Sequence, residues 1–541
     1  MRSAPQVPSL ALAIAAAAYL AARGASALDA ASLEKLASGD GSAKLAAVQE
    51  AVGSADVASL PVLRALLEGR LAIAAGGRAV VEENGAWLDP VTRQPASVAA
   101  AEVEKVSINN RLRRTLERAI AALGLFAPRA ADRLHAARTL QEGADEDLLP
   151  VLDRVLAQEK DGQVREAVQS LQGALLLGSR DRDKRLAAVD VLRRAPSTRS
   201  KRLLLERLGG AASDPGAEPD PAVRDAIHRA VNDIDGSLRL AEVVGWVFSG
   251  LSLGSVLLLA ALGLAITFGL MGVINMAHGE LLMIGAYATY VVQSFFRAHL
   301  PGAFDWYLLA AAPAAFLAAG VVGLLLEVTV VRALYGRPLE TLLATWGASL
   351  LLIQAVRSTF GAQNVEVANP SWMSGGVTVM TGLVLPYNRI AIVAFAGLVV
   401  FVVWLLIERT RLGLLVRAVM QNRGMAAGLG VATPWVDMLT FALGAGIAGL
   451  GGCALSQIGN VGPELGQGFI VDSFMVVVLG GVGQLAGTVL AAIGLGQVNK
   501  LLEPFAGAVL AKIAVLAFII LFIQRRPQGL FAPRGRAAEE A

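Results

Sequence analysis

The uneven distribution of charge constrains the fold of this 541-residue chain more than any other feature of its sequence. Residues 1–242 hold 32 of the 47 Lys and Arg residues and 32 of the 44 Asp and Glu residues, and no lysine occurs between Lys201 and Lys500. From residue 243 onward, hydrophobic segments of about 20 residues follow one another, and this length is sufficient to cross a bilayer. The sequence therefore predicts a polar first part and a membrane-embedded second part.

Five of the hydrophobic segments precede a loop that is rich in arginine. They cover residues 243–271, 274–295, 306–331, 339–360 and 390–407. The loop carries four arginines between residues 408 and 424, so the positive-inside rule places it in the cytoplasm. Five crossings then place the first part of the chain on the outer side of the membrane, which is periplasmic or extracellular.

Four further apolar segments follow that loop, at residues 438–458, 469–479, 487–498 and 506–523. They lead to Arg525 and Arg526, which the same rule places inside, so these segments must make an even number of crossings, two or four. We expect residues 241–541 to form an all-α polytopic membrane domain with about 7–9 spans.

Residues 1–27 have the features of a secretory signal. An apolar run at residues 10–22 follows Arg2, and the small residues Ala25, Ser26 and Ala27 predict cleavage after Ala27. An uncleaved anchor is the alternative, because Arg23 stands close to the cleavage site. Either interpretation exports the domain that follows.

Residues 28–240 alternate amphipathic helical segments with Asp, Gly and Pro breaks, and predict an exported α-helical domain. Asp40, Asp161, Asp181 and Asp220 each precede a basic residue by four positions and an alanine by six. We expect the aspartate to cap a helix, the basic residue to pair with it or its neighbour, and the alanine to admit close packing. The pattern is similar to that of HEAT-type helical repeats, and an irregular bundle fits it equally well. Residues 77–95 form a polar, β-prone insert.

Polar side chains interrupt the apolar run ITFGLMGVINMAHGELLMIGAYATY at residues 266–290. A carboxylate at membrane depth costs several kcal/mol unless it faces protein or water. We therefore predict that Asn275, His278, Gly279 and Glu280 line a translocation pathway. The alternative is that they only cap the ends of two half-helices.

A second motif, ERTRLGLLVRAVMQNRGMAAGLG at residues 408–430, is too polar to span a bilayer and is helical in propensity. We expect one cytoplasmic helix that Gly430 ends, and whose small residues insert into a groove of a partner. The predicted contact residues are Arg417, Ala418, Gln421, Asn422, Ala426, Ala427, Gly428 and Gly430. The alternative is a solvated loop that merely obeys the positive-inside rule.

Both motifs resemble those of the permease family of branched-chain amino acid type ABC importers, and the resemblance covers about residues 243–532. NMAHGELLMIGAYATY and RAVMQNRGMAAGLG look most like the urea-transporting branch, as do Gln421 and Asn422, where many members carry acidic residues. The resemblance implies a permease subunit for urea, with branched-chain amino acids or another small amide as the alternative. It also implies ATPase subunits, a second permease subunit and a periplasmic solute-binding protein as partners in a bacterial inner membrane. The end of the chain, RRPQGLF at residues 525–531, resembles the end motif of the family.

Other functions find little support in the sequence. The dipeptide Gly-Lys never occurs, so a Walker A loop cannot be written and energy must come from a partner. The histidines lack metal-ligand spacing, the single Cys453 allows no intrachain disulfide, and no basic stripe suggests nucleic acid. We expect no cofactor, no metal and no enzymatic activity. A passive channel or proton-coupled carrier that uses Glu280 and His278 is the alternative from another class.

Overall fold

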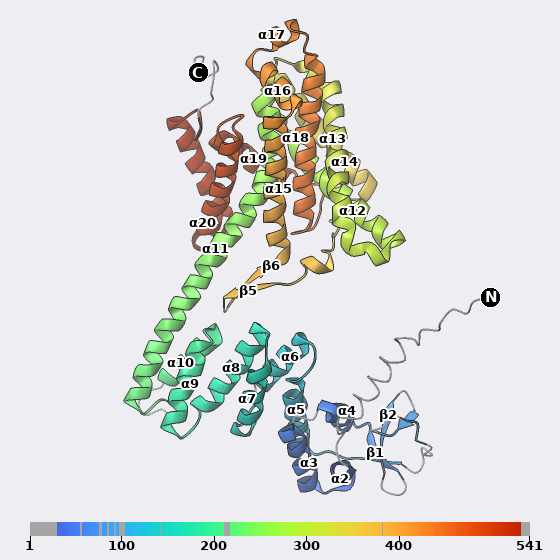
Figure 1. Ribbon diagram of the computed structural model, residues 1–541, viewed down its shortest axis with the longest axis vertical. Coiled ribbons are helices and arrows are strands. Elements are labelled where there is room, and N and C mark those ends of the chain that lie inside the picture. The colour runs from blue at the N-terminus through green and yellow to red at the C-terminus, as the bar shows by residue number, and fades with distance from the viewer. Residues whose placement is uncertain are drawn as a thin grey trace, which may run out of the picture. The chain divides into compact units, whose positions relative to one another are not determined.

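The computed structural model describes residues 30–54, 57–74, 78–83, 86–90, 94–96, 103–141, 143–209, 217–380 and 382–531. The predicted signal at residues 1–27 lies outside these described residues. The chain divides into two compact units, Met1–Leu240 and Ala241–Ala541, and each unit is described by itself (Figure 1).

The first unit begins with helices α2 (Ala30–Ser38), α3 (Gly41–Ser54) and α4 (Leu60–Leu67). Four antiparallel strands follow in the order β3-β2-β1-β4, namely β1 (Leu71–Ala74), β2 (Ala79–Glu83), β3 (Ala86–Leu88) and β4 (Val103–Lys105). The prediction of an all-α chain is therefore wrong here. The β-prone character of residues 77–95 is confirmed, since this insert supplies β2 and β3, and β-branched Val80 and Val81 are buried in the strand.

Helices connected by short loops complete the first unit. They are α5 (Asn110–Gly124), α6 (Ala130–Leu140), α7 (Leu149–Gln158), α8 (Gly162–Leu177), α9 (Arg182–Arg194), α10 (Thr198–Leu208) and the first part of α11 (Pro221–Met271). Their apolar faces pack together, as where Leu152 of α7 and Val168 of α8 share one core. Similarity to HEAT-type repeats stays a prediction.

The four aspartates of the sequence pattern all cap helices, as predicted. Each Oδ1 accepts a backbone N–H: Asp40 from Ala43 (2.7 Å), Asp161 from Gln163 (2.9 Å), Asp181 from Asp183 (2.9 Å) and Asp220 from Ala222 (2.8 Å). The expected pairing of the basic residue is wrong in two of the repeats. Arg165 donates to the backbone carbonyl of Glu159, and Arg185 pairs with Glu218 at 3.0 Å. Each aspartate already accepts a hydrogen bond from a backbone N–H group that it caps. The arginine therefore donates to a more buried acceptor instead.

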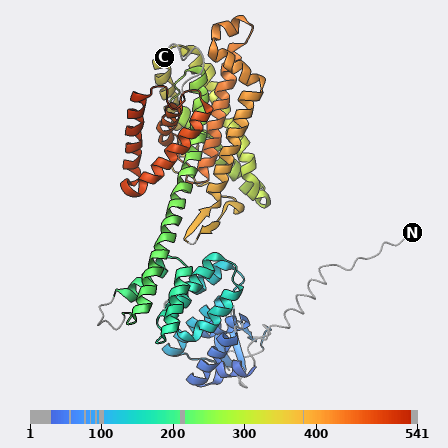
Figure 2. The same ribbon diagram turned by 60° about the vertical axis from the view of Figure 1, so that its left-hand side comes forward.

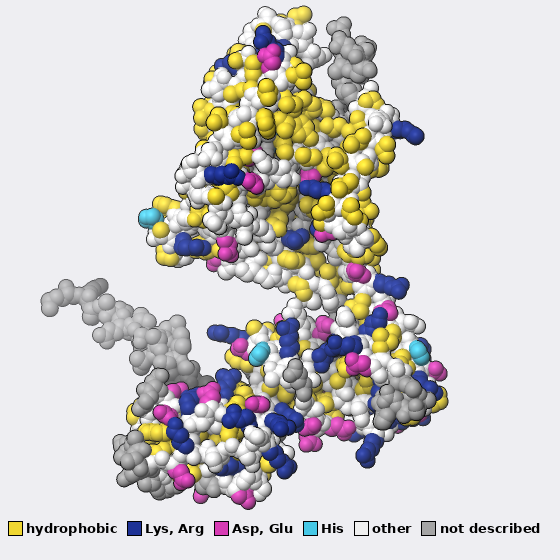
Figure 3. Space-filling model, turned by 180° about the vertical axis from the view of Figure 1, so that it is seen from behind, with side chains coloured by type: hydrophobic (Ala, Val, Ile, Leu, Met, Phe, Trp, Pro, Cys, Tyr) yellow, Lys and Arg dark blue, Asp and Glu magenta, His cyan; other side chains and the backbone are white. Residues whose placement is uncertain are grey.

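The second unit is a helix bundle. Its helices are the rest of α11, α12 (His278–His299), α13 (Tyr307–Leu326), α14 (Pro338–Phe360), α15 (Tyr387–Arg409), α16 (Arg411–Gln421), α17 (Arg423–Gly428), α18 (Thr433–Ser456), α19 (Gln467–Gly480) and α20 (Leu485–Arg525). A hairpin of β5 (Gly376–Met380) and β6 (Leu383–Pro386) lies at one end of this bundle, and α16 and α17 lie at the other (Figure 1). Hydrophobic side chains cover much of the visible face of this unit, as expected for contact with lipid (Figure 3).

Six helices of the described residues are long and apolar enough to cross a membrane. They are Pro221–Gly269, Pro301–Leu334, Pro338–Phe360, Tyr387–Arg409, Thr433–Ser456 and Leu485–Arg525. Two further apolar helices are not among these six, namely α12 with 22 residues and α19 with 14 residues. Helix α20 is broken at Gly507 (φ 77°), after Pro504, and Figure 2 shows its two arms folded back. The predicted count of 7–9 spans stays a prediction.

Small residues hold the central helices together, as the glycine-rich sequence of α18 predicts. A Cβ added to Gly263 of α11 or to Gly285 of α12 would overlap the backbone of α18 at Gly444 or Gly449. Between α11 and α20, Gly254 lies against Ile493 in the same way. Such contacts allow helix backbones to approach closely within a bilayer.

Candidate functional site

The predicted break in the Asn275–Glu280 stretch is present. Helix α11 ends at Met271, and Gly272 follows with φ 66°, a conformation that glycine adopts without strain. The chain then turns back, and Asn275 Oδ1 accepts a hydrogen bond from Ala277 N at 3.0 Å just before α12 begins. This hydrogen bond closes the turn before α12, while the N-cap residue of α12, Ala277, makes no side-chain capping hydrogen bond, so the choice between pathway and capping roles stays open.

His278 joins the start of α12 to the C-terminal part of α11. Its side chain is completely buried, and Nε2 lies 2.8 Å from the carbonyl oxygen of Ala260. Because a carbonyl only accepts, Nε2 carries the proton and Nδ1 is an unprotonated acceptor. Nδ1 has no hydrogen-bond partner within the part of the chain that the structure describes.

Glu280 lies in the first turn of α12 and is 2% exposed. Its Oε1 accepts a hydrogen bond from Ser349 Oγ of α14 at 2.7 Å, while Oε2 has no partner among the described residues. The sequence analysis missed Ser349. The sequence feature that could have identified it is the spacing of Thr341, Thr345 and Ser349. This spacing places three small hydroxyl residues on one face of an otherwise apolar helix.

This hydroxyl face of α14 supports the whole broken stretch. Thr341, Thr345 and Ser349 are all buried, and Thr345 Oγ1 accepts a hydrogen bond from Met276 N at 3.1 Å. The loop before α12 and the carboxylate within α12 are thus held by neighbouring turns of one helix.

Three buried polar atoms of the stretch lack a partner among the described residues: Asn275 Nδ2, His278 Nδ1 and Glu280 Oε2. They are one donor and two acceptors. Buried polar groups in proteins are almost always hydrogen-bonded, so such a cluster needs a physical reason. A polar solute or water that passes through the site would supply the missing partners.

The N-terminus of a second helix meets this site. Gly279 of α12 lies against Gly466, the residue before α19, so that a Cβ at Gly279 would lie 2.5 Å from the carbonyl oxygen of Gly466. Each helix N-terminus carries about half a positive charge, which stabilises a nearby carboxylate such as Glu280. In membrane transporters, discontinuous helices whose N-termini converge form solute sites of this kind. Sequence reasoning placed Gly279 here but missed Gly466.

The predicted single helix at residues 408–430 is wrong in detail, because the segment forms α16 and α17 as separate helices. Asn422 ends α16 and caps α17, since its Oδ1 accepts from Met425 N at 2.9 Å. The predicted stop at Gly430 is confirmed. Its φ is 90°, and its N–H donates to Ala427 O at 3.0 Å.

The predicted contact residues of this segment divide into two groups. Gln421, Ala427, Gly428 and Gly430 are exposed, beside the exposed apolar side chains of Met425 and Leu429. Asn422 and Arg417 are exposed as well but bind within the segment or to its neighbour α15, and Ala418 and Ala426 are covered to different degrees. Ala426 is buried against Val416, Val419 and Val436, Ala418 is half-buried, and Arg417 donates to Ile407 O at 2.9 Å and pairs with Glu408 at 3.2 Å.

The sequence analysis also missed an ion pair in the last helices of the second unit. Asp472 of α19, 8% exposed, lies 2.8 Å from Lys512 Nζ of α20. The end motif packs near these helices, because Leu530 N donates to Leu479 O at 2.8 Å.

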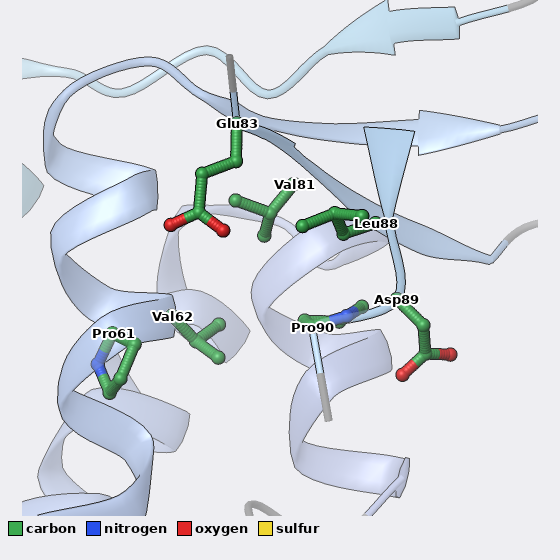
Figure 4. A pocket seen from close by; sticks show the side chains of 7 residues that line it. All are labelled: Pro61, Val62, Val81, Glu83, Leu88, Asp89 and Pro90. Carbon is green, nitrogen blue, oxygen red and sulfur yellow. The ribbon is translucent and has the colours of Figure 1, made fainter. Parts of the chain in front are cut away.

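A pocket in the first unit is lined by Pro61, Val62, Val81, Glu83, Leu88, Asp89 and Pro90 (Figure 4). It has room for about one water molecule. It belongs to the first unit and takes no part in the site around Glu280.

The apolar helices and the buried polar break define a polytopic helical membrane protein of the permease class. Residues 246–524 match the family model described as the permease component of branched-chain amino acid transport systems. The chain belongs to this family, which confirms the family resemblance of its motifs. The first unit lies outside the matched residues.

Three curated relatives are named high-affinity branched-chain amino acid transport system permease proteins. BraD of Pseudomonas aeruginosa is 30% identical over 288 residues, which cover 52% of this chain and 93% of that protein. LivH of Salmonella typhimurium and LivH of Escherichia coli are each 29% identical over 294 residues, covering 52% of this chain and 94% of theirs. No solved structure matches the chain.

Proposed function

We propose that this chain is a permease subunit of an ABC importer for urea, and that separate ATPase subunits drive it. The observation that carries the proposal is the group of unpartnered polar atoms at Asn275, His278 and Glu280, beside the converging starts of α12 and α19. Family membership supports the role of permease, and the resemblance of both motifs to the urea-transporting branch supports the substrate.

The site suits the hydrogen-bonding chemistry of urea. Urea N–H groups would donate to Glu280 Oε2, while the urea carbonyl would accept from Asn275 Nδ2 and from the start of α12. The groups that hydrogen-bond to Glu280 and Asn275, which are Ser349 Oγ and Ala277 N, are neutral. A neutral solute can replace its water hydrogen bonds here without requiring a counter-charge.

Branched-chain amino acids are the second candidate, because the curated relatives are named for them. An amino acid would place its ammonium group at Glu280 and its carboxylate at the helix starts. It would in addition need an apolar pocket for its side chain, whereas urea needs none.

We assign ATPase docking to the exposed part of the α16–α17 segment. Met425 is 64% exposed and Leu429 is 80% exposed, and Ala427, which lies between them in the sequence, is exposed as well. An exposed apolar group on a short helix fits a groove of a partner protein. The first unit, on the outer side by the positive-inside argument, would modulate docking of the solute-binding protein, and a second permease subunit would complete the pathway.

Uptake in reconstituted vesicles tests the proposal. The permease would be reconstituted with its ATPase subunits and solute-binding protein, and uptake of radiolabelled urea and leucine would be followed with and without ATP. We expect ATP-dependent uptake of urea that unlabelled leucine does not inhibit. Uptake of leucine without uptake of urea would support the second candidate, a permease for branched-chain amino acids. Uptake that needs neither ATP nor ATPase subunits would support a passive channel or a proton-coupled carrier.

A further inference from the structure

A cluster of charged side chains connects α17 to the ends of α13 and α18. Arg423 of α17 lies 2.6 Å from Asp437 of α18, and its guanidinium carbon lies 4.0 Å from the ring centre of Tyr335. Arg332 binds both carboxylate oxygens of Glu327, at 3.2 and 2.8 Å. Asp437 and Glu327 are 5% and 2% exposed, so both carboxylates depend on their arginines for charge compensation.

The two ion pairs lie on elements that pack against each other. The turn that begins with Glu327 packs against α18, the helix that carries Asp437. The cluster therefore joins three segments that are far apart in the sequence. They are the end of α13, the α16–α17 segment and the first turns of α18.

The end of α13 has an unusual backbone at this cluster. Residues Glu327–Val331 form a π-helical turn, and Arg332–Leu334 form a 3₁₀ turn. π-helical turns are rare, and they occur frequently at functional sites because their hydrogen-bond register differs from that of the α-helix. Glu327 is the first residue of the turn and Arg332 directly follows it, so the Glu327–Arg332 pair connects its two ends.

Close backbone contacts continue from this cluster to the site around Glu280. Helix α18 begins with the turns that hold Asp437, and further along its Gly449 packs against Ala315 of α13 and against Gly285 of α12. Gly285 lies five residues after Glu280 on the same helix. A displacement of α18 along its axis therefore displaces the first turns of α12.

We propose that the Arg423–Asp437 ion pair transmits movement of the α16–α17 segment to α18, and through α18 to the site at Glu280. The inference rests on the proposed function, in which α16–α17 contacts the ATPase. Separation of the two residues would leave a buried carboxylate without its partner, so α17 and α18 move together. The π-helical turn of α13 adjusts to this movement. Arg423 and Asp437 are positioning residues in this proposal, because neither contacts the solute.

The test compares solute uptake with ATP hydrolysis in the reconstituted complex. The variants are Arg423→Gln, Asp437→Asn and the charge exchange Arg423→Asp with Asp437→Arg. We expect each single variant to retain its ATPase subunits while the ATP hydrolysed per solute rises at least about fivefold, the lower end of typical coupling between sites. We expect the charge exchange to return this ratio to within about twofold of the parent.

Arg337→Gln is the matched control, because Arg337 pairs with Glu340 at 3.2 Å in the same connection between α13 and α14, but both side chains are exposed. Its ratio should equal that of the parent. If a neutralised variant does not assemble, Arg423→Lys replaces it, since lysine keeps the charge but loses the planar guanidinium contact. A parent-like ratio in the assembled variants, or no recovery in the charge exchange, overturns the proposal. Absence of ATP-dependent uptake in the parent would instead reject the proposed function.

Discussion

Gly279 and Gly466 bring the starts of α12 and α19 into backbone contact, although the two glycines are 187 positions apart in the sequence. The contact works in both directions, because a Cβ on Gly466 would overlap the carbonyl group of Gly279. Only glycine at both positions allows this approach. Two helices therefore begin at the same place, where three buried polar atoms have no partner among the described residues.

We predict that Gly279→Val reduces the amount of folded permease, since its side chain would meet the backbone of Gly466, which cannot move aside as a side chain can. Overpacking of this kind costs about 1–3 kcal/mol. Thermal unfolding of the purified protein in detergent measures the effect. Gly347→Ala in α14 is the control, because no atom lies within 4 Å of its added Cβ. Equal unfolding temperatures for the two variants would show that the close contact is unimportant.

We predict that Glu280→Gln leaves membrane abundance near normal and lowers uptake at least about tenfold, which corresponds to about 1.4 kcal/mol of lost transition-state interaction. The amide keeps one acceptor oxygen for Ser349 Oγ but replaces Oε2, which has no partner among the described residues, with an NH2 donor. Radiolabelled uptake per assembled complex in vesicles is the measurement. Uptake per complex equal to that of the parent would mean that Glu280 is structural.

Ser349→Ala tests whether the orientation of the Glu280 carboxyl group matters for uptake while that group itself is kept. The variant removes the donor at 2.7 Å from Glu280 Oε1 and leaves the carboxylate in place. A typical intramolecular hydrogen bond contributes only about 0.5–1.5 kcal/mol. We expect a decrease in uptake smaller than that of Glu280→Gln, with normal abundance. A larger decrease in Ser349→Ala would assign the solute contact to the hydroxyl group instead.

The positions of the polar break and of the cytoplasmic segment could be predicted, because a carboxylate in an apolar run and an arginine-rich loop are local signals. The roles of Ser349 and Gly466 could not be predicted. In the sequence, a serine in α14 and a glycine before α19 look like ordinary packing residues until the helices are arranged in space. Sequence reasoning also expected one helix at residues 408–430. The N-cap of Asn422 divides it, because a side-chain amide competes with the backbone for Met425 N. Of the small sheet in the first unit, only β2 and β3 lie in the insert that the sequence marked as β-prone, and β1 and β4 lie outside it.

We predict that Ala427→Trp uncouples ATP hydrolysis from uptake while the permease remains folded, because Ala427 is exposed on α17. Ala426→Trp is the contrasting variant. Ala426 is 4% exposed among Val416, Val419 and Val436, so the larger ring should lower abundance as well. Co-purification of the ATPase subunits reports the docking. Normal co-purification and normal solute-stimulated hydrolysis in Ala427→Trp would contradict the assignment of this surface.

Arg417→Glu should also uncouple hydrolysis from uptake, but for a different reason. Arg417 donates to Ile407 O and pairs with Glu408, so it fixes the angle between α15 and α16. Reversal of its charge places two glutamates together and releases the segment. Exchange of the pair, Arg417→Glu with Glu408→Arg, should restore part of the coupling, and failure of the exchange to do so would point to direct contact of Arg417 with the ATPase.

We predict that the first unit loses stability in acid through Glu159. Arg133 donates to both carboxylate oxygens, at 2.7 and 2.9 Å, and these hydrogen bonds hold the pKa of Glu159 below its usual value of 4.5. A depressed pKa contributes stability above the unfolded value, and this contribution is lost as pH falls through the folded value. The protection factors of the α7 and α8 amides, which remove the intrinsic pH dependence of hydrogen exchange, should therefore fall below about pH 4.5 in the parent. Glu159→Gln should exchange faster at neutral pH, because the half-buried Arg133 loses its ion pair with Glu159, and a parent-like rate at neutral pH would contradict this.

The last prediction concerns removal of the first unit. Deletion of residues 30–236, with the signal retained, should leave membrane insertion intact, because α11 keeps its contacts with α20 inside the second unit, such as Gly254 with Ile493. Transport should remain ATP-dependent, since the Glu280 site and the α16–α17 segment are complete without these residues. We expect the affinity for the solute-binding protein to fall, and surface plasmon resonance against the reconstituted complex measures it. The solute concentration for half-maximal uptake should rise by the same factor at limiting binding protein. If transport and binding-protein affinity were both unchanged, a docking role for the first unit would be wrong.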